Sequence, residues 1–502
     1  MQTEYSPILI FIFLLPFLGL AFYPVLVKRS IIWAAYVSAF ICALCFLMIT
    51  PLIPQVLRGK LIVSSTIYFS PQNTFNPQMV FSLRADAFGV YFAWVSALVW
   101  LLAAVFSCEY LKQTAHPLRY FCLFSACLSF VFGIAFAGNL FTLFIFYELL
   151  TISGYPLIAH EETSQAKAAA KKYIIYSLLG DALVLFTVLL VYYMAGNLEL
   201  HRRGTIPAQT GVESLRLLLV CGLLGFGVKS AIMPLHGWIY EAHPAAPAPA
   251  SAVLSGVFVN VGAYGLIRLI YDVIGFRLMR QGALGMIVVF PALVTILLTS
   301  IQAYNQDNLK RRLAYSTSAQ ISYILLGAAL LSPNSLQGGI IHMAYHAIMK
   351  ATLFLCAGAI VKAGGSEDVS RMNGLGAKMP LIMIAFSIAG LSLVGIPPTT
   401  GFISKWMLAT GALEVSDTGS VVILLLGSLL SALYILPVIY AAFLKKDTDQ
   451  TADISETNYQ PAALTVPLII GAALSVLMGI FVNLPGFPFS FARVISASFL
   501  GR

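Results

Sequence analysis

Residues 214–240 read SLRLLLVCGLLGFGVKSAIMPLHGWIY, an apolar run that is long enough to cross a bilayer as a helix. Lys229 lies near the middle of this run, and Pro234 follows it. Proline removes a backbone donor, so we expect the helix to break at this point. A broken helix inside a membrane exposes backbone polar groups and makes room for water, and it is tolerated only where other protein segments surround it. A lysine beside such a break can exchange protons.

The composition of the whole chain excludes a soluble fold. Of its 502 residues, 59% are hydrophobic and only 10% are charged, whereas soluble domains carry about 25% charged residues. The apolar runs are too long for the strands of a membrane barrel, so we expect an all-α membrane protein. About 14 transmembrane helices are predicted, at 6–27, 31–53, 82–107, 119–137, 139–160, 170–194, 214–240, 250–271, 283–304, 313–331, 335–362, 379–413, 421–443 and 463–484.

The net charge of +9 does not indicate a nucleic-acid partner, because no basic stripe with interleaved aromatic residues accompanies it. Most of the Lys and Arg residues lie in short loops, and the loops on one side carry more of them, among them Lys310, Arg311 and Arg312. The positive-inside rule then predicts that both termini lie outside. The seven cysteines form no CxxC pair and read as small buried hydrophobes.

A second predicted span is also interrupted. Pro397, Pro398 and Gly401 break the run at 379–413, and Lys405 follows the break. The two interrupted spans lie five spans apart, and matching interruptions of this kind are typical of transporters built from inverted repeats. The odd offset of five spans implies that the two repeats have inverted topology. Helices 1–3 with an outer loop at 54–80 precede them at 1–118, and the last helix with a short tail follows at 463–502.

Glu148 lies inside an apolar run, with no Lys or Arg within one helical turn. An ionisable group near the bilayer centre costs at least about 2.5–3.5 kcal/mol, so such residues are functional candidates. Two plainer interpretations stay open. Glu148 can form an ion pair that only holds two helices together, and Lys229 can extend its amine toward the membrane surface.

His342, His346 and Lys350 follow each other at i, i+4 and i+8, so they lie on one face of a helix. A row of exchangeable groups along one face is what a proton relay needs. Two histidines at this spacing can also bind a metal ion, but neither a third ligand nor a general base accompanies them, so we expect no metal site. The alternative is that both histidines are core residues with satisfied hydrogen bonds.

Five segments together resemble a known family, the antiporter-like membrane subunits of respiratory complex I, of Mrp-type sodium/proton antiporters and of energy-converting membrane hydrogenases. The segments are 146–149, 229–247, 306–317, 342–350 and 395–405. They cover most of residues 119–443. The family fold has fourteen helices with two inverted five-helix repeats, and the resemblance implies that they lie here at 119–271 (helices 4–8) and 283–443 (helices 9–13).

The resemblance implies a proton relay made of Glu148, Lys229, His342, His346, Lys350 and Lys405. Glu148 and Lys229 would form the charged pair of the first half-channel, and Lys405 would be the terminal lysine of the second. Asp181 resembles an acidic position of some members, and His236 and Glu241 are further candidates in the matched segment after Lys229. Many relatives carry a lysine in the eighth span, where this chain has Asn260.

The parent complex stays open between an Mrp antiporter, a hydrogenase and a complex I-like oxidoreductase, and so does the transport of sodium. The chain shows no dinucleotide fingerprint and no cysteine cluster. We therefore expect no cofactor in this chain, and any electron transfer would belong to partner subunits. The resemblance implies other membrane subunits, including homologous antiporter-like ones, as partners in a prokaryotic inner (plasma) membrane. A structural membrane subunit and a stand-alone secondary transporter are the alternatives.

Overall fold

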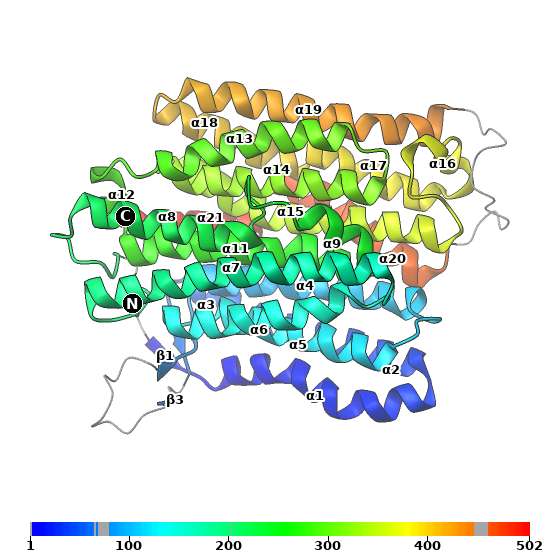
Figure 1. Ribbon diagram of the computed structural model, residues 1–502, viewed down its shortest axis with the longest axis horizontal. Helices are drawn as coiled ribbons and strands as arrows, with labels where there is room; N and C mark the ends of the chain where they lie inside the picture. Colours follow the sequence, from blue (N-terminus) through cyan, green and yellow to red (C-terminus); the bar gives the residue numbers. More distant parts are fainter. Residues whose placement is uncertain (1–2, 65–66, 69–79, 202, 446–459, 502) are drawn as a thin grey trace.

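The computed structural model describes residues 3–64, 67–68, 80–201, 203–445 and 460–501. The chain folds into a bundle of helices that run roughly along one direction, with α1 and α19 at opposite edges and both termini at the same end (Figure 1). The helices are α1 (Ile8–Arg29), α2 (Ile31–Ile49), α3 (Ile53–Leu57), α4 (Ala87–Tyr110), α5 (Pro117–Ala135), α6 (Leu140–Ile158), α7 (Ser164–Ala195), α8 (Val212–Lys229), α9 (Ile239–Ala245), α10 (Ala248–Val253), α11 (Val259–Arg268), α12 (Phe276–Gln281), α13 (Met286–Tyr304), α14 (Leu309–Ala329), α15 (Pro333–Lys362), α16 (Leu375–Lys378), α17 (Pro380–Val394), α18 (Thr400–Glu414), α19 (Thr418–Leu444), α20 (Ala462–Ile480) and α21 (Pro488–Phe499).

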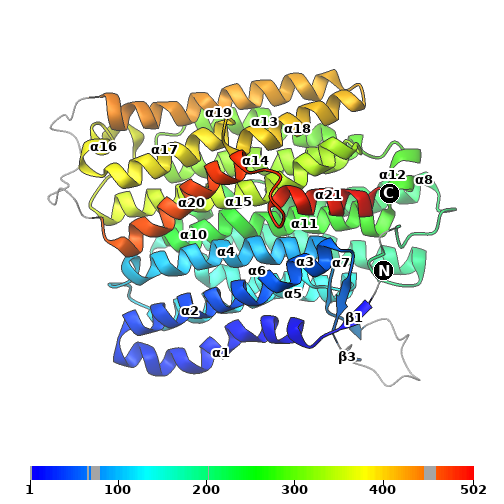
Figure 2. The ribbon, with the colours of Figure 1, turned by 180° about the vertical axis from the view of Figure 1, so that it is seen from behind.

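Short strands lie near the end of the bundle that carries the termini (Figure 2). β1 (Thr3–Tyr5) pairs in parallel with β2 (Leu61–Val63), and β2 pairs antiparallel with β5 (Arg84–Ala85). β3 (Ile67–Tyr68) and β4 (Val80–Phe81) form a separate antiparallel pair. Within the predicted outer loop at 54–80, residues 65–66 and 69–79 lie outside the described part of the chain. The sheet joins the start of α1 to the segment that precedes α4.

Among the described residues, eleven helices are long and apolar enough to cross a membrane. The chain is therefore an integral membrane protein, as its composition predicted. Three of the predicted spans are not among these eleven helices. The span at 214–240 divides into α8 and α9, and the span at 379–413 divides into α17 and α18. The third, α14, carries Lys310, Arg311 and Arg312 in its first turn, which lowers its mean hydropathy.

Helix α15 passes through the middle of the bundle and is almost entirely buried. It contacts α4, α10, α14, α17, α18, α20 and α21. Its start is fixed by a capping box, in which Ser332 and Ser335 accept hydrogen bonds from each other's backbone N–H groups. Because α15 carries His342, His346 and Lys350, the predicted row lies in the centre of the fold.

Both predicted helix breaks are present. α8 ends at Lys229, and the chain turns through residues 230–238, with a cis bond before Pro234, before α9 begins. α17 ends at Val394, and the next residue, Gly395, has φ +93°, a backbone conformation that glycine adopts without strain. A cis bond joins Pro397 and Pro398, and α18 then carries Lys405.

The structure also contains elements that the apolar pattern did not predict. The predicted span at 250–271 is not a uniform α-helix, because the π-helical turns η2 (Leu254–Phe258) and η3 (Leu269–Ile274) flank α11. Such turns are rare and are frequently found at functional sites. The tail after α20 forms a further helix, α21, which packs on α4 and α15.

Candidate functional site

The Lys229 side chain lies at the end of α8 and is 1% exposed. Its Nζ atom donates to the Tyr147 carbonyl at 3.2 Å and to the Thr151 hydroxyl, both on α6. The ammonium also lies 3.4 Å from the centroid of the Tyr147 ring, at a distance typical of a cation–π contact. The carboxylate that pairs with it is Asp181 of α7, with 3.4 Å between Nζ and Oδ1.

Thr151 connects both members of this ion pair. Its hydroxyl donates to Asp181 Oδ2 at 2.6 Å while accepting from Lys229. Glu148 is half-buried on the same helix, and its electrostatic neighbours are Asp181 and then Lys229. The expected ion pair between Glu148 and Lys229 is therefore not the one that forms: Asp181 takes the place of Glu148 as the direct partner. Two neighbouring carboxylates repel each other unless a proton or a cation lies close by, so the three groups act as one cluster.

His236 lies in the turn between α8 and α9, with its ring near those of Tyr240 and Tyr315, and Glu241 lies in α9 itself. Nζ of Lys172, on α7, forms an ion pair with Glu241 Oε1 at 2.7 Å and also donates to the Tyr240 hydroxyl at 3.1 Å. The Tyr240 ring stacks on Tyr315 of α14, with 5.0 Å between centroids. The sequence analysis did not single out Lys172, although it lies in a basic segment at the start of a predicted span.

His346 and His342 lie on α15 with 6.4 Å between their ring centroids, and both are fully buried. His346 Nδ1 lies 3.5 Å from the Asn260 amide nitrogen of α11, and the Asn260 amide also donates to the Gly256 carbonyl at 2.7 Å. Asn260, at the eighth-span position, thus directly contacts His346, the middle member of the row on α15. His342 Nδ1 bonds to the Ser404 hydroxyl of α18 at 2.8 Å, and its Nε2 bonds to Gln320 Oε1 of α14 at 3.1 Å.

Lys350 completes the row on α15 and is also fully buried. Its Nζ donates to the Leu313 carbonyl at 2.9 Å and to the Ser316 hydroxyl of α14. Lys229 and Lys350 are therefore held in the same way, by a backbone carbonyl and a hydroxyl about one turn further along a neighbouring helix. His243 of α9 lies near Lys350 and packs on Phe354 at 4.7 Å. Its ring is fully buried, and the sequence analysis assigned it no role.

Lys405 lies beside the second break. Its Nζ donates to the carbonyls of Leu393 and Val394 at 2.9 Å each, and it lies 5.1 Å from the Tyr323 ring centroid. These carbonyls are at the end of α17, where backbone acceptors lack partners within the helix and the helix dipole favours a cation. Ser404, the preceding residue, bonds to His342, so the second break is joined to the central row.

Several buried polar atoms near the buried lysines and histidines described above have no hydrogen-bond partner among the described residues. They are Tyr147 Oη, Ser230 Oγ, Asn260 Oδ1, Ser318 Oγ, Gln320 Nε2, Tyr323 Oη, His346 Nε2 and both ring nitrogens of His243. Buried polar groups are almost always hydrogen-bonded to protein or to ordered water. Because these atoms lie beside the lysines and histidines of the row, we expect water to bridge the gaps between them.

A second buried charge cluster was missed by the sequence analysis. Arg268 of α11 binds Asp86 through two bonds of 2.7 Å each and Asp272 through one of 2.6 Å. The Tyr264 hydroxyl accepts from the same guanidinium at 2.8 and 3.0 Å. Arg268 and Asp272 follow each other at i and i+4 inside an apolar run, so the rule that identified Lys229 would also have found them.

Among the described residues, His, Cys, Asp and Glu form no group of three or more that could hold a metal ion.

Comparison with known proteins adds independent information. Residues 137–433 match the family model described as NADH:quinone oxidoreductase/Mrp antiporter, TM. The chain is 34% identical to NADH-quinone oxidoreductase subunit N of Desulforudis audaxviator over 76% of this chain and 78% of that protein. It is 27% identical to a subunit of the Na(+)/H(+) antiporter of Bacillus subtilis, over 79% of this chain and 80% of that one.

A solved structure is similar along nearly the whole length. The match is to a chain of the membrane-bound sulfane sulfur reductase (MBS), an archaeal respiratory membrane complex. The TM-score is 0.85 at 25% sequence identity, covering 99% of this chain and 98% of that one. The bundle therefore has the fold of a membrane subunit from a respiratory complex.

Proposed function

The chain belongs to the NADH:quinone oxidoreductase/Mrp antiporter family, and we propose that it moves protons along a path of buried ionisable side chains that starts at Lys229 and ends at Lys405. This membership confirms the resemblance predicted from the sequence motifs. The chain is thus an antiporter-like subunit of the kind found in such membrane complexes. The alternatives, a purely structural subunit and a stand-alone transporter, are not favoured.

One observation carries the proposal. Seven ionisable side chains are almost fully buried inside a membrane bundle: Lys229, Asp181, His243, Lys350, His346, His342 and Lys405. Burying one such group is costly. Apolar residues would pack better at these positions, so packing alone does not explain why several ionisable groups are buried. The unpartnered polar atoms beside the row support a path in which water joins neighbouring groups.

The proposed cycle is electrostatic. Asp181 and Glu148 compete for the positive charge of Lys229, and Thr151 bonds to both Lys229 and Asp181. When the Lys229 ammonium leaves Asp181, the loss of this attraction in a medium of low dielectric favours the release of its proton. The proton then passes along α15 from Lys350 through His346 to His342 and on to Lys405, and each arrival raises the cost of charge on the next group.

We propose that the membrane architecture has fourteen spans. Eleven helices have the length and mean hydropathy of a span by themselves. The three remaining spans would be α8 with α9, α14, and α17 with α18. The inverted repeats would then occupy 119–271 and 283–443, after an N-terminal unit at 1–118 and before the last helix and tail at 463–502. One interrupted span in each repeat supports this division.

We also propose that the chain works in a prokaryotic plasma membrane with both termini outside. Its partners would be other membrane subunits, including homologous antiporter-like ones, and its cargo would be protons, with sodium as a second ion in an Mrp-type complex. A hydrogenase-type or complex I-like parent would instead couple the row to a redox module. In either case the chain itself would hold no cofactor, and electron transfer would occur in partner subunits.

Ion-driven pH changes in membrane vesicles that contain the whole native complex test the proposal. The complexes that assemble with Lys229→Ala or with Lys405→Ala should lose transport, because each change removes a group that must accept and release the proton. Adding and omitting sodium then separates antiport from proton pumping alone. Normal transport by both assembled variants would show that the buried charges only hold helices together, and the relay would be abandoned.

A further inference from the structure

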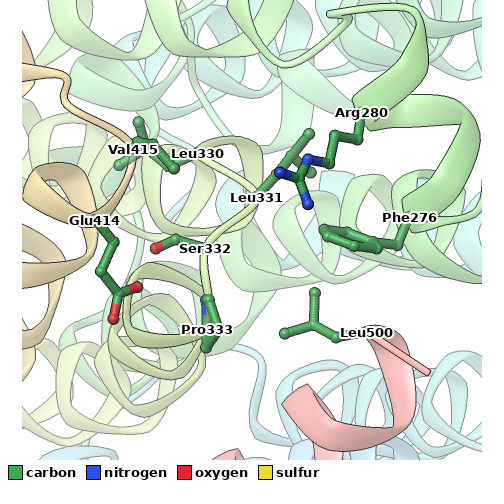
Figure 3. A pocket seen from close by; sticks show the side chains of 9 residues that line it. All are labelled: Phe276, Arg280, Leu330, Leu331, Ser332, Pro333, Glu414, Val415 and Leu500. Atoms are coloured by element: carbon green, nitrogen blue, oxygen red, sulfur yellow. The ribbon is translucent and has the colours of Figure 1, made fainter. Parts of the chain in front are cut away.

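A groove with an apolar end and a charged end lies at the end of the bundle that carries the termini. Its centre is a pocket of about 510 Å³ between α12, the α14–α15 turn and the end of α18 (Figure 3). A second pocket of about 430 Å³ shares Leu330, Leu331 and Val415 with the first. The two pockets are therefore adjacent parts of one groove, and both volumes are in the range of small-molecule sites.

The outer end of this groove opens onto the lipid-facing surface. The second pocket is lined by Met286, the first residue of α13, which is 60% exposed. One turn further along α13, Phe290 is 67% exposed. Large apolar side chains this exposed on a membrane-crossing helix face lipid. Ser416 and Asp417 also line the second pocket, but its α13 wall is apolar, so an acyl chain lying along α13 can enter the groove past Met286 and Val289.

The other end of the groove carries two exposed side chains of opposite charge. Arg280 of α12 extends toward Leu331 from one wall, and Glu414 at the end of α18 stands on the other wall (Figure 3). The Glu414 carboxylate is oriented by Asn334, whose side-chain amide donates to Oε1 at 2.6 Å. Among the described residues, no carboxylate lies within ion-pair distance of Arg280. The guanidinium is thus available for an anion, and each Glu414 oxygen retains a second lone pair for a cation.

We propose that this groove binds a phospholipid with a zwitterionic amine headgroup, of the phosphatidylethanolamine class. The phosphate lies on Arg280, the headgroup amine lies on Glu414, and one acyl chain follows Leu331 and Val415 to Met286. An arginine matches phosphate oxygens with two parallel donors. The opposite charges select a zwitterion over an anionic lipid, because a headgroup without an amine leaves Glu414 unpaired beside the phosphate.

This lipid would have a structural consequence within the fold. It would touch α12, α13, α15 and α18, which lie far apart in the sequence, between residues 276 and 414. Ser332 and Pro333, in the wall of the groove, begin the helix that carries the central histidines. The site does not depend on the proton relay, so it can be tested without measuring transport.

The test measures lipid retained by the native complex after purification in a mild detergent, with mass spectrometry of the extracted phospholipids. Wild type should retain one phosphatidylethanolamine per chain that Arg280→Gln loses. Arg280→Lys should retain part of it, since an ammonium still binds phosphate as a point charge. Arg216→Gln is the matched control, because Arg216 is exposed on α8 and pairs with Glu213 away from the groove. It should leave retention unchanged.

Headgroup selection gives a second readout. When phosphatidylethanolamine and phosphatidylglycerol are supplied together, Glu414→Gln should keep a bound phospholipid while its preference for the zwitterion falls by about fivefold, the size of one exposed ion pair. Equal retention by wild type and Arg280→Gln would overturn the proposal. So would a photoreactive side chain placed at Val415 that crosslinks to another subunit and not to lipid.

Discussion

Asp181, and not Glu148, forms the ion pair with Lys229, and a single hydroxyl, that of Thr151, bonds to both members of the pair. Lys229→Met alone leaves the Asp181 carboxylate buried without its cation, which should destabilise the complex by about 3–5 kcal/mol. Adding Asp181→Asn should restore most of that loss, while adding Glu148→Gln should restore less. Thermal unfolding of the assembled complex measures these differences. If Glu148→Gln restores as much stability as Asp181→Asn, then Asp181 is not the main partner of Lys229.

Removing only the hydroxyls that hold the lysines should slow transport. Thr151→Val and Ser316→Ala each delete one hydrogen bond to a buried ammonium, which is worth about 1.5–3 kcal/mol. If the bond is made during proton transfer, each change lowers the transport rate by about tenfold or more. Thr187→Val is the control, since the Thr187 hydroxyl donates within its own helix, to the Leu183 carbonyl at 2.8 Å. Equal rates in all three variants would contradict this role.

Lys405→Arg separates the structural role of this side chain from its proton chemistry. A guanidinium can still donate to the carbonyls of Leu393 and Val394, so the end of α17 stays satisfied. Arginine does not release its proton in proteins. We expect an assembled complex of near wild-type thermal stability that transports no protons in vesicles. Lys362→Arg, at the end of α15, should be neutral in both assays; transport by Lys405→Arg would remove Lys405 from the relay.

The cluster around Arg268 should respond as a structural unit. Arg268→Met leaves the buried carboxylates of Asp86 and Asp272 without their cation, at a cost of about 3–5 kcal/mol. We expect the variant to fail to accumulate in the membrane, as measured by quantitative immunoblotting. Arg216→Met, an exposed site on α8, should accumulate normally. An Arg268→Met variant at wild-type level would indicate that the cluster contributes little to the fold.

His160, in the loop after α6, should make the protein sensitive to acid. Burial, followed by the positive charges of Arg119 and His116, lowers the pKa of His160 to about 4. The unfolded chain binds this proton from about pH 6.5 downward. The native protein therefore loses stability as the pH falls from 6.5 toward 4, on the order of 2 kcal/mol in total, and keeps the full contribution above pH 6.5.

His160→Gln should remove this pH dependence, which a series of thermal unfolding curves between pH 7 and pH 4 would measure. His201→Gln, at an exposed position, is the control and should retain the wild-type slope. A His160→Gln variant whose stability falls as steeply as that of wild type would assign the acid sensitivity to other groups.

The class of the protein and most of the row follow from the amino-acid pattern without any knowledge of the fold. Apolar runs of bilayer length can only be membrane helices. Charged residues inside such runs can be recognised without knowing their neighbours in the fold, so the sequence predicted that Lys229, Lys350 and Lys405 lie inside the bundle. The proline residues predicted both helix breaks. The spacing of His342 and His346 followed from helical periodicity, because residues four apart lie on one face.

Which groups meet depends on how the helices pack, and the pattern does not contain that information. The partner of Lys229 depends on how α7 is rotated against α8, and one face of α7 cannot be selected from a uniformly apolar pattern. The contact of Asn260 with His346 depends on the π-helical turns around α11, which propensity does not reveal. Likewise, the hydroxyls of Thr151, Ser316 and Ser404 carry no charge and look like any small buried residue until the fold places them beside an ionisable group.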